Sequence, residues 1–461
     1  MPCNFIPPYL LRRIAAISDD PQASASCART LTADARLRER RGKAGAAPAP
    51  EPPVIHSTRV ISDAHNTERL PGTVARVDGE PLTGDRAVDD GFDWSGQTLE
   101  LFFNAFGRRS FDDRGSPVLA TVHYGRDYDN AFWDGTQLVF GDGDGRIFEP
   151  FTKPIDVLAH EFAHGVTQYS AGFRYEDQPG ALSESMSDVF GSIVKQYARG
   201  ETVEQADWLI GQGIFRPTVQ GRALRSMLEP GTAYDDPLLG SDPQVASMRD
   251  YVVTDADNGG VHINSGIPNR AFALLATDLG GQSWQQPGQI WYAALMSDEV
   301  DQNTEFRGFA NATIAAANRL YPDDPNVADL VRRAWTSVDV LEAELGALME
   351  REPAQLTSED QGQYVSVRRT GGVAGITRTY QLDLSDEREG SEARRLLAEI
   401  ERQQGERQAS PAPGARPPAA DRFVYSINYG DRSIQAGEVD LNPELDSLIR
   451  LVMARGQEVL R

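Results

Sequence analysis

The segment HEFAH, residues 160–164, lies within IDVLAHEFAHGVTQYS (155–170), where apolar residues recur at spacings of three and four. This period predicts one helix, on which His160 and His164 project from the same face one turn apart. The apolar flanking residues predict that the helix is buried, and buried imidazoles need partners. Two imidazoles and one carboxylate form the open three-ligand zinc site of a hydrolase, with Glu161 beside the attacking water as general base.

The third zinc ligand is expected in a second helical segment, ALSESMSDVFGSIVKQYARG (181–200). Glu184 lies there, twenty residues after His164. Asp188 follows one turn later on the same helical face, where its carboxylate is expected to accept the ring N–H of a ligating histidine and fix its tautomer. The alternative is that Asp188 is only a surface acid.

A third segment, DNGGVHINSGIPNR (257–270), places His262 after a Gly-Gly turn and just before an expected helix. An oxyanion develops on the carbonyl during amide hydrolysis, and a donor such as His262 stabilises it. Asp257, five residues earlier, is expected to orient His262 and to raise its basicity. Taken with the first two segments, this one predicts a zinc peptidase.

The chain has 461 residues, too many for one ordinary core, and changes in composition divide it into three parts. Residues 1–53 combine a short module with an Ala- and Pro-rich linker (41–53), which suggests a propeptide with a cleavable linker. An ordinary flexible tail is the alternative. Residues 54–350 are expected to form the peptidase domain, and residues 355–461 a separate small α+β domain.

The peptidase domain has strand-like runs in its first half and helical periodicity in its second half. Strands are expected at residues 59–64, 72–77, 98–106, 118–125 and 131–143. We therefore expect an α+β fold with a β-rich N-lobe, a helical C-lobe and the zinc helix at their junction, where a substrate cleft is expected.

Composition limits the partners and the location of the protein. A formal net charge of −23 argues against nucleic acid and anionic membranes as partners. The two cysteines, Cys3 and Cys27, leave the rest of the chain without a disulfide framework or a thiolate metal site. The N-terminus lacks the pattern of a signal peptide, and no run approaches the length of a membrane span. A cytoplasmic monomer is expected, with unconventional secretion left open.

Four motifs together resemble the thermolysin family of zinc endopeptidases: HEFAH, GALSESMSDVFG (180–191), NAFWDG (130–135) and DNGGVHINSGIPNR. The resemblance covers about residues 60–345 and implies a two-lobed thermolysin-like fold. It also implies the roles of the catalytic residues, with zinc bound by His160, His164 and Glu184, Glu161 as general base, and His262 and Tyr175 as transition-state donors.

The same resemblance implies how a substrate is bound. Asn130 and Ala131 would bind the substrate backbone, and Arg225 would bind a substrate carbonyl. The pocket for the residue after the scissile bond would be apolar and lined by Phe148, Phe151, Val157 and Leu224. Large hydrophobic side chains would then be preferred at that position.

One departure from the family concerns its double calcium site. Asp156 is retained, but Lys195 stands where the family has a glutamate and Val203 where it has an aspartate. Calcium needs several carboxylate or carbonyl oxygens, and a lysine ammonium would replace the ion. Calcium binding at this site is therefore not expected.

Lys195, the short N-terminal module and its PPYLL segment (7–11) resemble the protealysin-like branch, in which a short propeptide inhibits the enzyme in cis and is removed by self-cleavage. By this resemblance Phe5 to Leu11 would dock on the peptidase domain, and processing would fall within residues 41–56.

Near the C-terminus, three stretches resemble emfourin, a proteinaceous inhibitor associated with protealysin-like enzymes: VSVRRTGGVAGITRTYQLDL (365–384), FVYSINYG (423–430) and PELDSLIRLV (443–452). We expect a neutral zinc metalloendopeptidase that acts on peptides and proteins, is made as a zymogen, and has both its propeptide and its C-terminal domain as intramolecular inhibitors. For that domain the alternatives are inhibition in trans after release and a solubilising appendage. For the whole chain the alternative is a catalytically silenced scaffold that serves as a regulatory binding protein.

Overall fold

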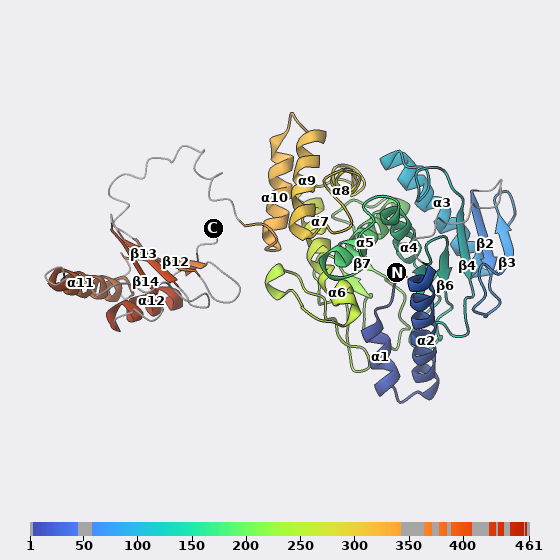
Figure 1. The fold of residues 1–461 in the computed structure, drawn as a ribbon, viewed down its shortest axis with the longest axis horizontal. Coiled ribbons are helices and arrows are strands. Elements are labelled where there is room, and N and C mark those ends of the chain that lie inside the picture. The colour runs from blue at the N-terminus through green and yellow to red at the C-terminus, as the bar shows by residue number, and fades with distance from the viewer. Residues whose placement is uncertain are drawn as a thin grey trace. The chain divides into compact units, whose positions relative to one another are not determined.

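The structure, a computed structural model, describes the chain in two compact units, Met1–Glu342 and Ala343–Arg461 (Figure 1). The residues that it describes are 3–44, 58–342, 364–370, 378–384, 389–407, 424–429, 432–437, 443–455 and 457–458. Each unit has its own apolar core and is considered by itself.

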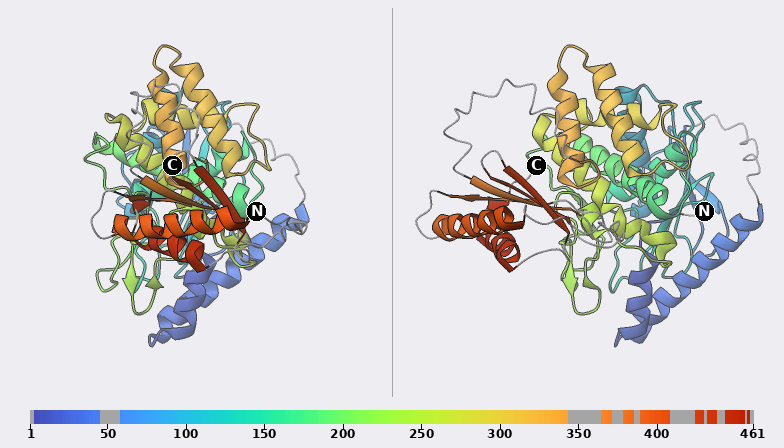
Figure 2. Two further views of the ribbon diagram at one scale, coloured as in Figure 1. Left: turned by 90° about the vertical axis from the view of Figure 1, so that its left-hand side faces the viewer. Right: turned by 60° about the vertical axis from the view of Figure 1, so that its left-hand side comes forward.

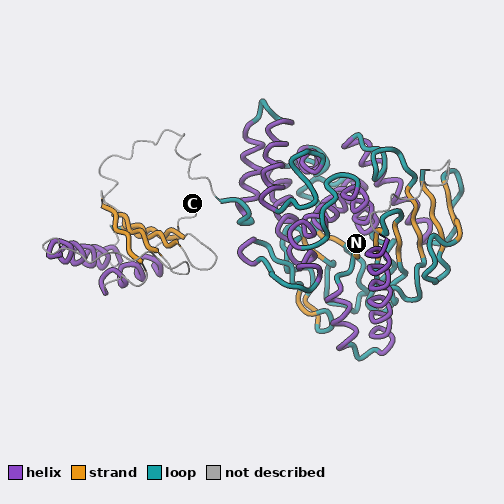
Figure 3. The backbone as a smooth tube through the Cα atoms, viewed as in Figure 1, coloured by secondary structure: helices purple, strands orange, loops and turns teal. Residues whose placement is uncertain are grey.

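The N-lobe of the first unit is built on a six-stranded sheet, whose strands are orange in Figure 3. Across the sheet the order is β1 (Cys3–Asn4), β5 (Ala131–Trp133), β6 (Leu138–Phe140), β4 (Val118–Val122), β2 (Arg59–Asp63) and β3 (Thr73–Val77). The three strands β6, β4 and β2 run parallel, and the remaining neighbours pair antiparallel. One edge strand, β1, thus comes from the N-terminal module.

The strand expected over residues 98–106 is wrong, because these residues form the second half of helix α3 (Arg86–Phe106). The Asp85 side chain caps the helix start by accepting hydrogen bonds from two backbone N–H groups, and Gly107 ends the helix with a φ of 67°. Aromatic and apolar residues in this run suggested a strand. They instead continue a buried face that begins at Val88 and Phe92.

Two long helices form the junction between the lobes, α4 (Ile155–Gln168) and α5 (Asp177–Arg199). They pack closely because Gly191 faces the backbone of α4, where an added Cβ would lie 2.9 Å from the Asp156 carbonyl oxygen. This close approach brings the candidate ligands of the two helices together.

Helices form most of the C-lobe, in agreement with the periodicity of the sequence. They are α6 (Asp257–Asn264), α7 (Gly266–Leu279), α8 (Gln286–Leu295), α9 (Phe306–Leu320), α10 (Pro325–Ser337) and the short η1 (Met248–Asp250). Two small hairpins lie between α5 and α6, formed by β7 (Leu209–Ile210) with β8 (Arg225–Ser226) and by β9 (Asp235–Asp236) with β10 (Gly240–Ser241). The buried Trp291 and Trp335 rings stack at 5.7 Å and tie α8 to α10.

The N-terminal module consists of β1 and two helices, α1 (Pro8–Ile17) and α2 (Pro21–Ala44), which pack side by side in Figures 1 and 2. Residues 41–44, which were expected to begin the linker, continue α2 instead, even though Gly42 lies among them. The rest of that expected linker lies outside the described residues.

The described residues of the second unit form a five-stranded antiparallel sheet and two helices. The strand order is β14 (Arg432–Gly437), β13 (Val424–Tyr429), β11 (Tyr364–Thr370), β12 (Arg378–Asp383) and β15 (Gln457–Glu458). The helices are α11 (Glu389–Arg407) and α12 (Pro443–Arg455). Val365, Val367, Ile427 and Leu448 are buried in its core. The α+β class expected from the sequence is therefore confirmed.

Candidate active site

Three side chains converge at the α4–α5 junction, His160 and His164 from α4 and Glu184 from α5. One ligand atom from each lies within 4.8 Å of the others, and all three residues are buried. Within the part of the chain that the structure describes, no other group of three such residues is arranged for a metal. The donor set of two imidazole nitrogens and one carboxylate oxygen fits zinc.

Protonation and hydrogen bonding in this cluster also suit a metal. Burial, and then the neighbouring His160, lower the pKa of His164 well below its ordinary value, so the ring is neutral as a metal ligand must be. Glu184 Oε2 accepts no hydrogen bond from any described residue. A buried carboxylate oxygen without a donor is costly unless a cation satisfies it.

Asp188 fixes the first of these ligands. Its Oδ1 lies 2.9 Å from His160 Nδ1, and its carboxylate also accepts bonds from Arg225 Nε at 2.8 Å and Nη2 at 2.7 Å. Burial alone would raise the pKa of Asp188, but Arg225 and His160 outweigh it and hold that pKa far below the usual range. Asp188 is completely buried, which rules out a surface acid.

A fourth donor to Asp188 was not anticipated from the sequence. Asn269 Nδ2 lies 2.9 Å from Asp188 Oδ2 and is also buried. Asn269 belongs to the DNGGVHINSGIPNR segment, but nothing in the spacing of that segment distinguishes a residue that reaches α5.

Glu161 is completely buried on α4, beside the ligand cluster. Burial, followed by the charge of Glu184, raises the pKa of Glu161 well above its usual range. A carboxylate with a raised pKa is a stronger base, which suits a group that accepts a proton near neutral pH. A divalent cation at the three ligands would stabilise the ionised form of Glu161.

His262 faces the cluster from α6. It follows Asn258, Gly259 and Gly260, whose left-handed backbone angles interrupt α6, and it lies in the last turn of α6, four residues before α7 begins. This turn places Asp257 Oδ1 2.7 Å from His262 Nδ1. Burial opposes the charged imidazole, but Asp257 and Glu184 raise the pKa of His262 to about 9.

Tyr175 completes this side of the site. Its hydroxyl donates a hydrogen bond to Glu184 Oε1, and its ring centroid lies 6.5 Å from that of His262. The two residues that the family resemblance gave as transition-state donors thus lie on the same side of the ligand cluster.

In this structure the residues expected to bind substrate contact the N-terminal module. Asn130 Oδ1 accepts a bond from Ile6 N at 2.8 Å, the Ala131 carbonyl oxygen accepts one from Phe5 N at 3.0 Å, and Arg225 Nη1 donates to the Phe5 carbonyl at 3.3 Å. The expected pocket residues are buried in one continuous apolar cluster with Phe5, and they are Phe148, Phe151, Val157 and Leu224.

Helix α2 adds polar contacts that were not predicted from the sequence. Tyr128 Oη donates to Asp34 Oδ1 at 2.5 Å, Asn130 Nδ2 donates to Asp34 Oδ2 at 3.3 Å, and Ser26 Oγ donates to Asp129. These bonds join residues about a hundred positions apart, so no local pattern reveals them.

At the expected calcium position, Lys195 Nζ lies between Asp156 and Asp207, at 3.3 Å and 2.7 Å from their carboxylates. Val203 is buried and apolar there.

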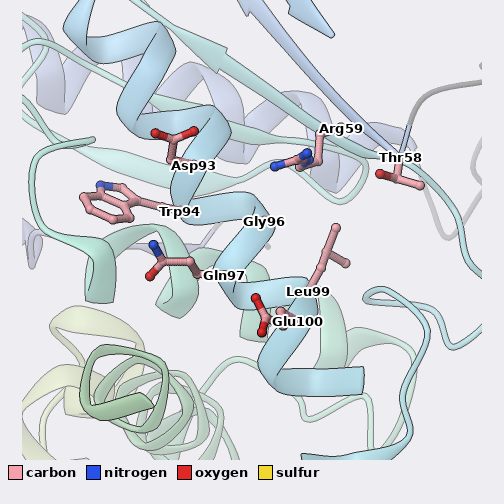
Figure 4. Close-up of a pocket in the computed structure, with 8 residues that line it drawn as sticks. All are labelled: Thr58, Arg59, Asp93, Trp94, Gly96, Gln97, Leu99 and Glu100. Carbon is pink, nitrogen blue, oxygen red and sulfur yellow. The ribbon is translucent and has the colours of Figure 1, made fainter. Parts of the chain in front are cut away.

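A hollow of about 510 Å³ lies on α3, between that helix and the start of β2 (Figure 4). Polar side chains such as Arg59, Asp93 and Glu100 line it, and it includes none of the expected site residues. Among the described helices, none is both long enough and apolar enough to cross a membrane.

Comparison with protein families gives three matches. The model of the thermolysin metallopeptidase catalytic domain matches residues 61–168, and that of the thermolysin metallopeptidase alpha-helical domain matches residues 171–340. The emfourin model matches residues 367–453.

Individual relatives agree with these matches. An extracellular metalloprotease of Pectobacterium carotovorum is 48% identical over 342 residues, which are 73% of this chain and 96% of the relative. The extracellular minor metalloprotease of Serratia marcescens is 39% identical over 291 residues, or 62% of this chain and 80% of the relative. The precursor of protealysin from Serratia proteamaculans is a solved structure with 47% identity and a TM-score of 0.66, covering 74% of this chain and all of that one.

These names correct one expectation. A cytoplasmic location was expected because the N-terminus lacks a signal-peptide pattern, but the two relatives are named extracellular enzymes, which points to secretion. The resemblance to the protealysin-like branch and to emfourin is confirmed.

Proposed function

This chain belongs to the thermolysin family of metallopeptidases, and from that premise we propose that His160, His164 and Glu184 hold the zinc ion of a neutral endopeptidase. The observation that carries the proposal is the buried three-ligand cluster, whose first histidine is fixed by Asp188. A ligand oriented by a hydrogen-bonded carboxylate is typical of zinc sites.

Zinc in such a site supplies Lewis-acid activation of water and of the substrate carbonyl. Glu161 takes a proton from the attacking water and later delivers it to the leaving nitrogen. His262, held charged by Asp257, donates its Nε2 proton to the oxygen on which negative charge develops, and Tyr175 assists from the same side.

The substrate binds as an extended strand along the edge of β5. Asn130 and Ala131 bind its backbone, and Arg225 binds the carbonyl of the residue that follows the scissile bond. The apolar pocket takes the side chain of that residue, so peptide bonds on the N-terminal side of large hydrophobic residues are cleaved. Burial of such a side chain contributes roughly 1.5–3 kcal/mol, enough to dominate the choice among substrates.

The N-terminal module keeps this enzyme inactive as a zymogen. Phe5, Ile6, Leu10 and Leu11 are completely buried against the peptidase lobes, so a substrate cannot reach the groove while the module is docked. Cleavage of the linker within residues 41–56 releases the module. The emfourin-like unit is a second inhibitor carried by the same chain.

The test of the catalytic proposal compares zinc-loaded wild type with Glu161→Gln on a quenched peptide that has phenylalanine after the scissile bond, once the N-terminal module has been removed. Loss of the base is expected to lower kcat by 10²- to 10⁴-fold, on the order of the contribution of a general base. Bound zinc, measured by atomic absorption, is expected to stay at one ion per chain. Glu80→Gln, at an exposed turn of the N-lobe, is the control.

If Glu161→Gln is as active as wild type, this mechanism is wrong. No activity from processed, zinc-loaded wild type would favour the silenced scaffold, which has no support from the relatives. The emfourin-like unit is tested by comparing the processed chain with a version that ends at Glu342, the boundary of the first compact unit. Higher activity of the shorter chain is expected if the unit inhibits in cis, and equal activity would remove that role.

A further inference from the structure

The first residues of the chain are bound as an added strand. Strand β1 pairs antiparallel with β5, with Cys3 opposite Trp133 and Asn4 opposite Phe132. The pairing continues as Phe5 N donates to the Ala131 carbonyl oxygen at 3.0 Å. These are backbone contacts, which any extended peptide of the same direction can make.

The register of this strand is fixed by Phe5. Its ring is completely buried and meets the His160 ring edge-on, with centroids 5.2 Å apart, while the Arg225 guanidinium lies 4.9 Å from the ring centroid. The far end of the ring reaches Gly211, where an added Cβ would be 3.1 Å from Phe5 Cζ and 3.3 Å from Leu224 Cβ. Phe5 therefore fills the pocket proposed above for the residue after the scissile bond.

The peptide group before Phe5 lies at the catalytic residues. His262 Nε2 lies 2.9 Å from the carbonyl oxygen of Asn4, which is the contact proposed for the carbonyl under attack. On the other side, the Phe5 carbonyl oxygen accepts from Arg225 and Ile6 N donates to Asn130. An N-terminal segment that only blocked the groove would not have to run in this direction or to pair with β5 in this register.

We propose that the Asn4–Phe5 bond is a substrate of this chain's own active site, so that the zymogen trims its first residues separately from processing in the linker. The proposal rests on the function proposed above. In the reaction the oxygen of one water molecule bonds to the carbonyl carbon of Asn4, and the bond from that carbon to the Phe5 nitrogen breaks. Glu161 carries a proton from the water to that nitrogen, leaving a carboxyl group on Asn4 and an amino group on Phe5.

Trimming leaves most of the module's anchors in place. Phe5 keeps its pocket, Ile6 keeps its bonds to Asn130, and α1 keeps the buried Leu10 and Leu11. The new amino group stays beside the Ala131 carbonyl oxygen that accepts the present N–H. The trimmed module is thus a bound product that still covers the groove.

The experiment uses the full chain, prepared without metal and then supplied with zinc. N-terminal sequencing and intact mass are followed over time in wild type and in Glu161→Ala. A species that begins at Phe5 is expected in wild type, with a rate constant independent of protein concentration, and is expected to be absent from Glu161→Ala. Phe5→Leu keeps a large apolar side chain and should retain trimming, whereas Phe5→Gly should slow it by roughly 10- to 100-fold through the empty pocket.

A second readout does not depend on catalysis. In metal-free Glu161→Ala, deuterium uptake is measured in the peptic peptide that covers residues 4–11. We expect slow uptake in this protein and fast uptake once Phe5→Gly is added. If uptake without Phe5→Gly is already as fast as in an unfolded peptide, the docked register is overturned.

Peptide hydrolysis by the same preparation, measured after its linker has been processed, separates the two proposals. If the preparation hydrolyses the peptide but no species that begins at Phe5 forms, self-trimming is overturned and the enzyme proposal stands. Equal trimming in wild type and Glu161→Ala also overturns it, because another protease would then make the cut. If neither peptide hydrolysis nor trimming is observed, both proposals are overturned.

Discussion

Lys195 and Asp156 form a buried ion pair between α5 and α4, with Lys195 Nζ 3.3 Å from Asp156 Oδ2. The same ammonium donates to Asp207 Oδ1 at 2.7 Å and to the carbonyl oxygen of Leu209. One cation therefore lies among two carboxylates and a backbone carbonyl, the oxygen ligands that calcium prefers. A calcium ion would have to displace the lysine.

From this pairing we expect Lys195→Met to destabilise the first unit by about 3–5 kcal/mol, because two buried or half-buried carboxylates lose their counter-charge. Urea unfolding measures the change. Lys153→Met is the control, since the Lys153 side chain is 40% exposed and its ion pair with Glu149 at 3.5 Å should contribute only about 0–1 kcal/mol. We also expect the Tm of zinc-loaded wild type to be unaffected by added calcium. A calcium-dependent Tm would contradict the replacement of the ion by Lys195.

A second prediction concerns the affinity for zinc. Asp188→Asn removes the charge that holds His160 Nδ1 and leaves Arg225 without its bidentate partner. Loss of such a supporting carboxylate is expected to weaken zinc binding by roughly 10- to 100-fold. Competition against a metal buffer measures the dissociation constant.

The matched control for that variant is Asp78→Asn, which removes another carboxylate paired with an arginine, Arg59 at 2.7 Å, but in the N-lobe away from the ligand cluster. Its zinc affinity should equal that of wild type. If Asp188→Asn binds zinc as tightly as wild type does, Asp188 has only a structural role.

The third prediction separates transition-state stabilisation from metal binding. His262→Ala should keep its zinc, because His262 is not one of the three ligands, and should lose roughly 10²- to 10³-fold in kcat with little change in KM. Asp257→Asn should lose less, because the imidazole remains but is no longer held by the carboxylate at 2.7 Å. Steady-state kinetics of the processed enzyme, with zinc content determined on the same samples, provide the measurement. An unchanged kcat in His262→Ala would exclude the proposed donor.

Sequence reasoning predicted the ligand cluster because its chemistry is local. A helical period around HEFAH fixes two ligands on one face, and a second period brings Glu184 and Asp188 to one face of the next helix. The same reasoning failed over residues 98–106, where an apolar run matched a strand as well as a helix. The run forms a helix because Asp85 and Gly107, which lie outside the run, cap the two ends of α3.

The contacts of the N-terminal module could not be derived from periodicity at all. Asn4 meets His262 across 258 positions in the chain, and Ile6 meets Asn130 across 124. Only a family resemblance pointed to docking of residues 5–11, and it did not reveal the register. That register depends on how the Phe5 ring fits a pocket formed by segments that are distant in the sequence. Such a fit can be seen only in the folded chain.

The last prediction concerns stability against pH. His123 directly follows β4, and its ring contacts two carboxylates, with Nδ1 2.8 Å from Asp142 Oδ1 and Nε2 3.0 Å from Oδ2 of Asp85, the residue that caps α3. The hydrogen bond to Asp142 raises the pKa of His123 to about 9, against burial and with further help from Asp85. Because the folded pKa lies above the unfolded value near 6.5, the protonated ring stabilises the fold fully below about pH 6.5, and this stabilisation is lost as pH rises toward 9. After allowance for solvent screening, the free energy of unfolding should fall by about 1–2 kcal/mol across that window because of this residue.

Urea unfolding at a series of pH values measures this fall in the free energy of unfolding. The fall due to His123 should disappear in His123→Gln and persist in His65→Gln, whose side chain is mostly exposed. The same slope in His123→Gln as in wild type would mean that the ring is not charged between the two acids.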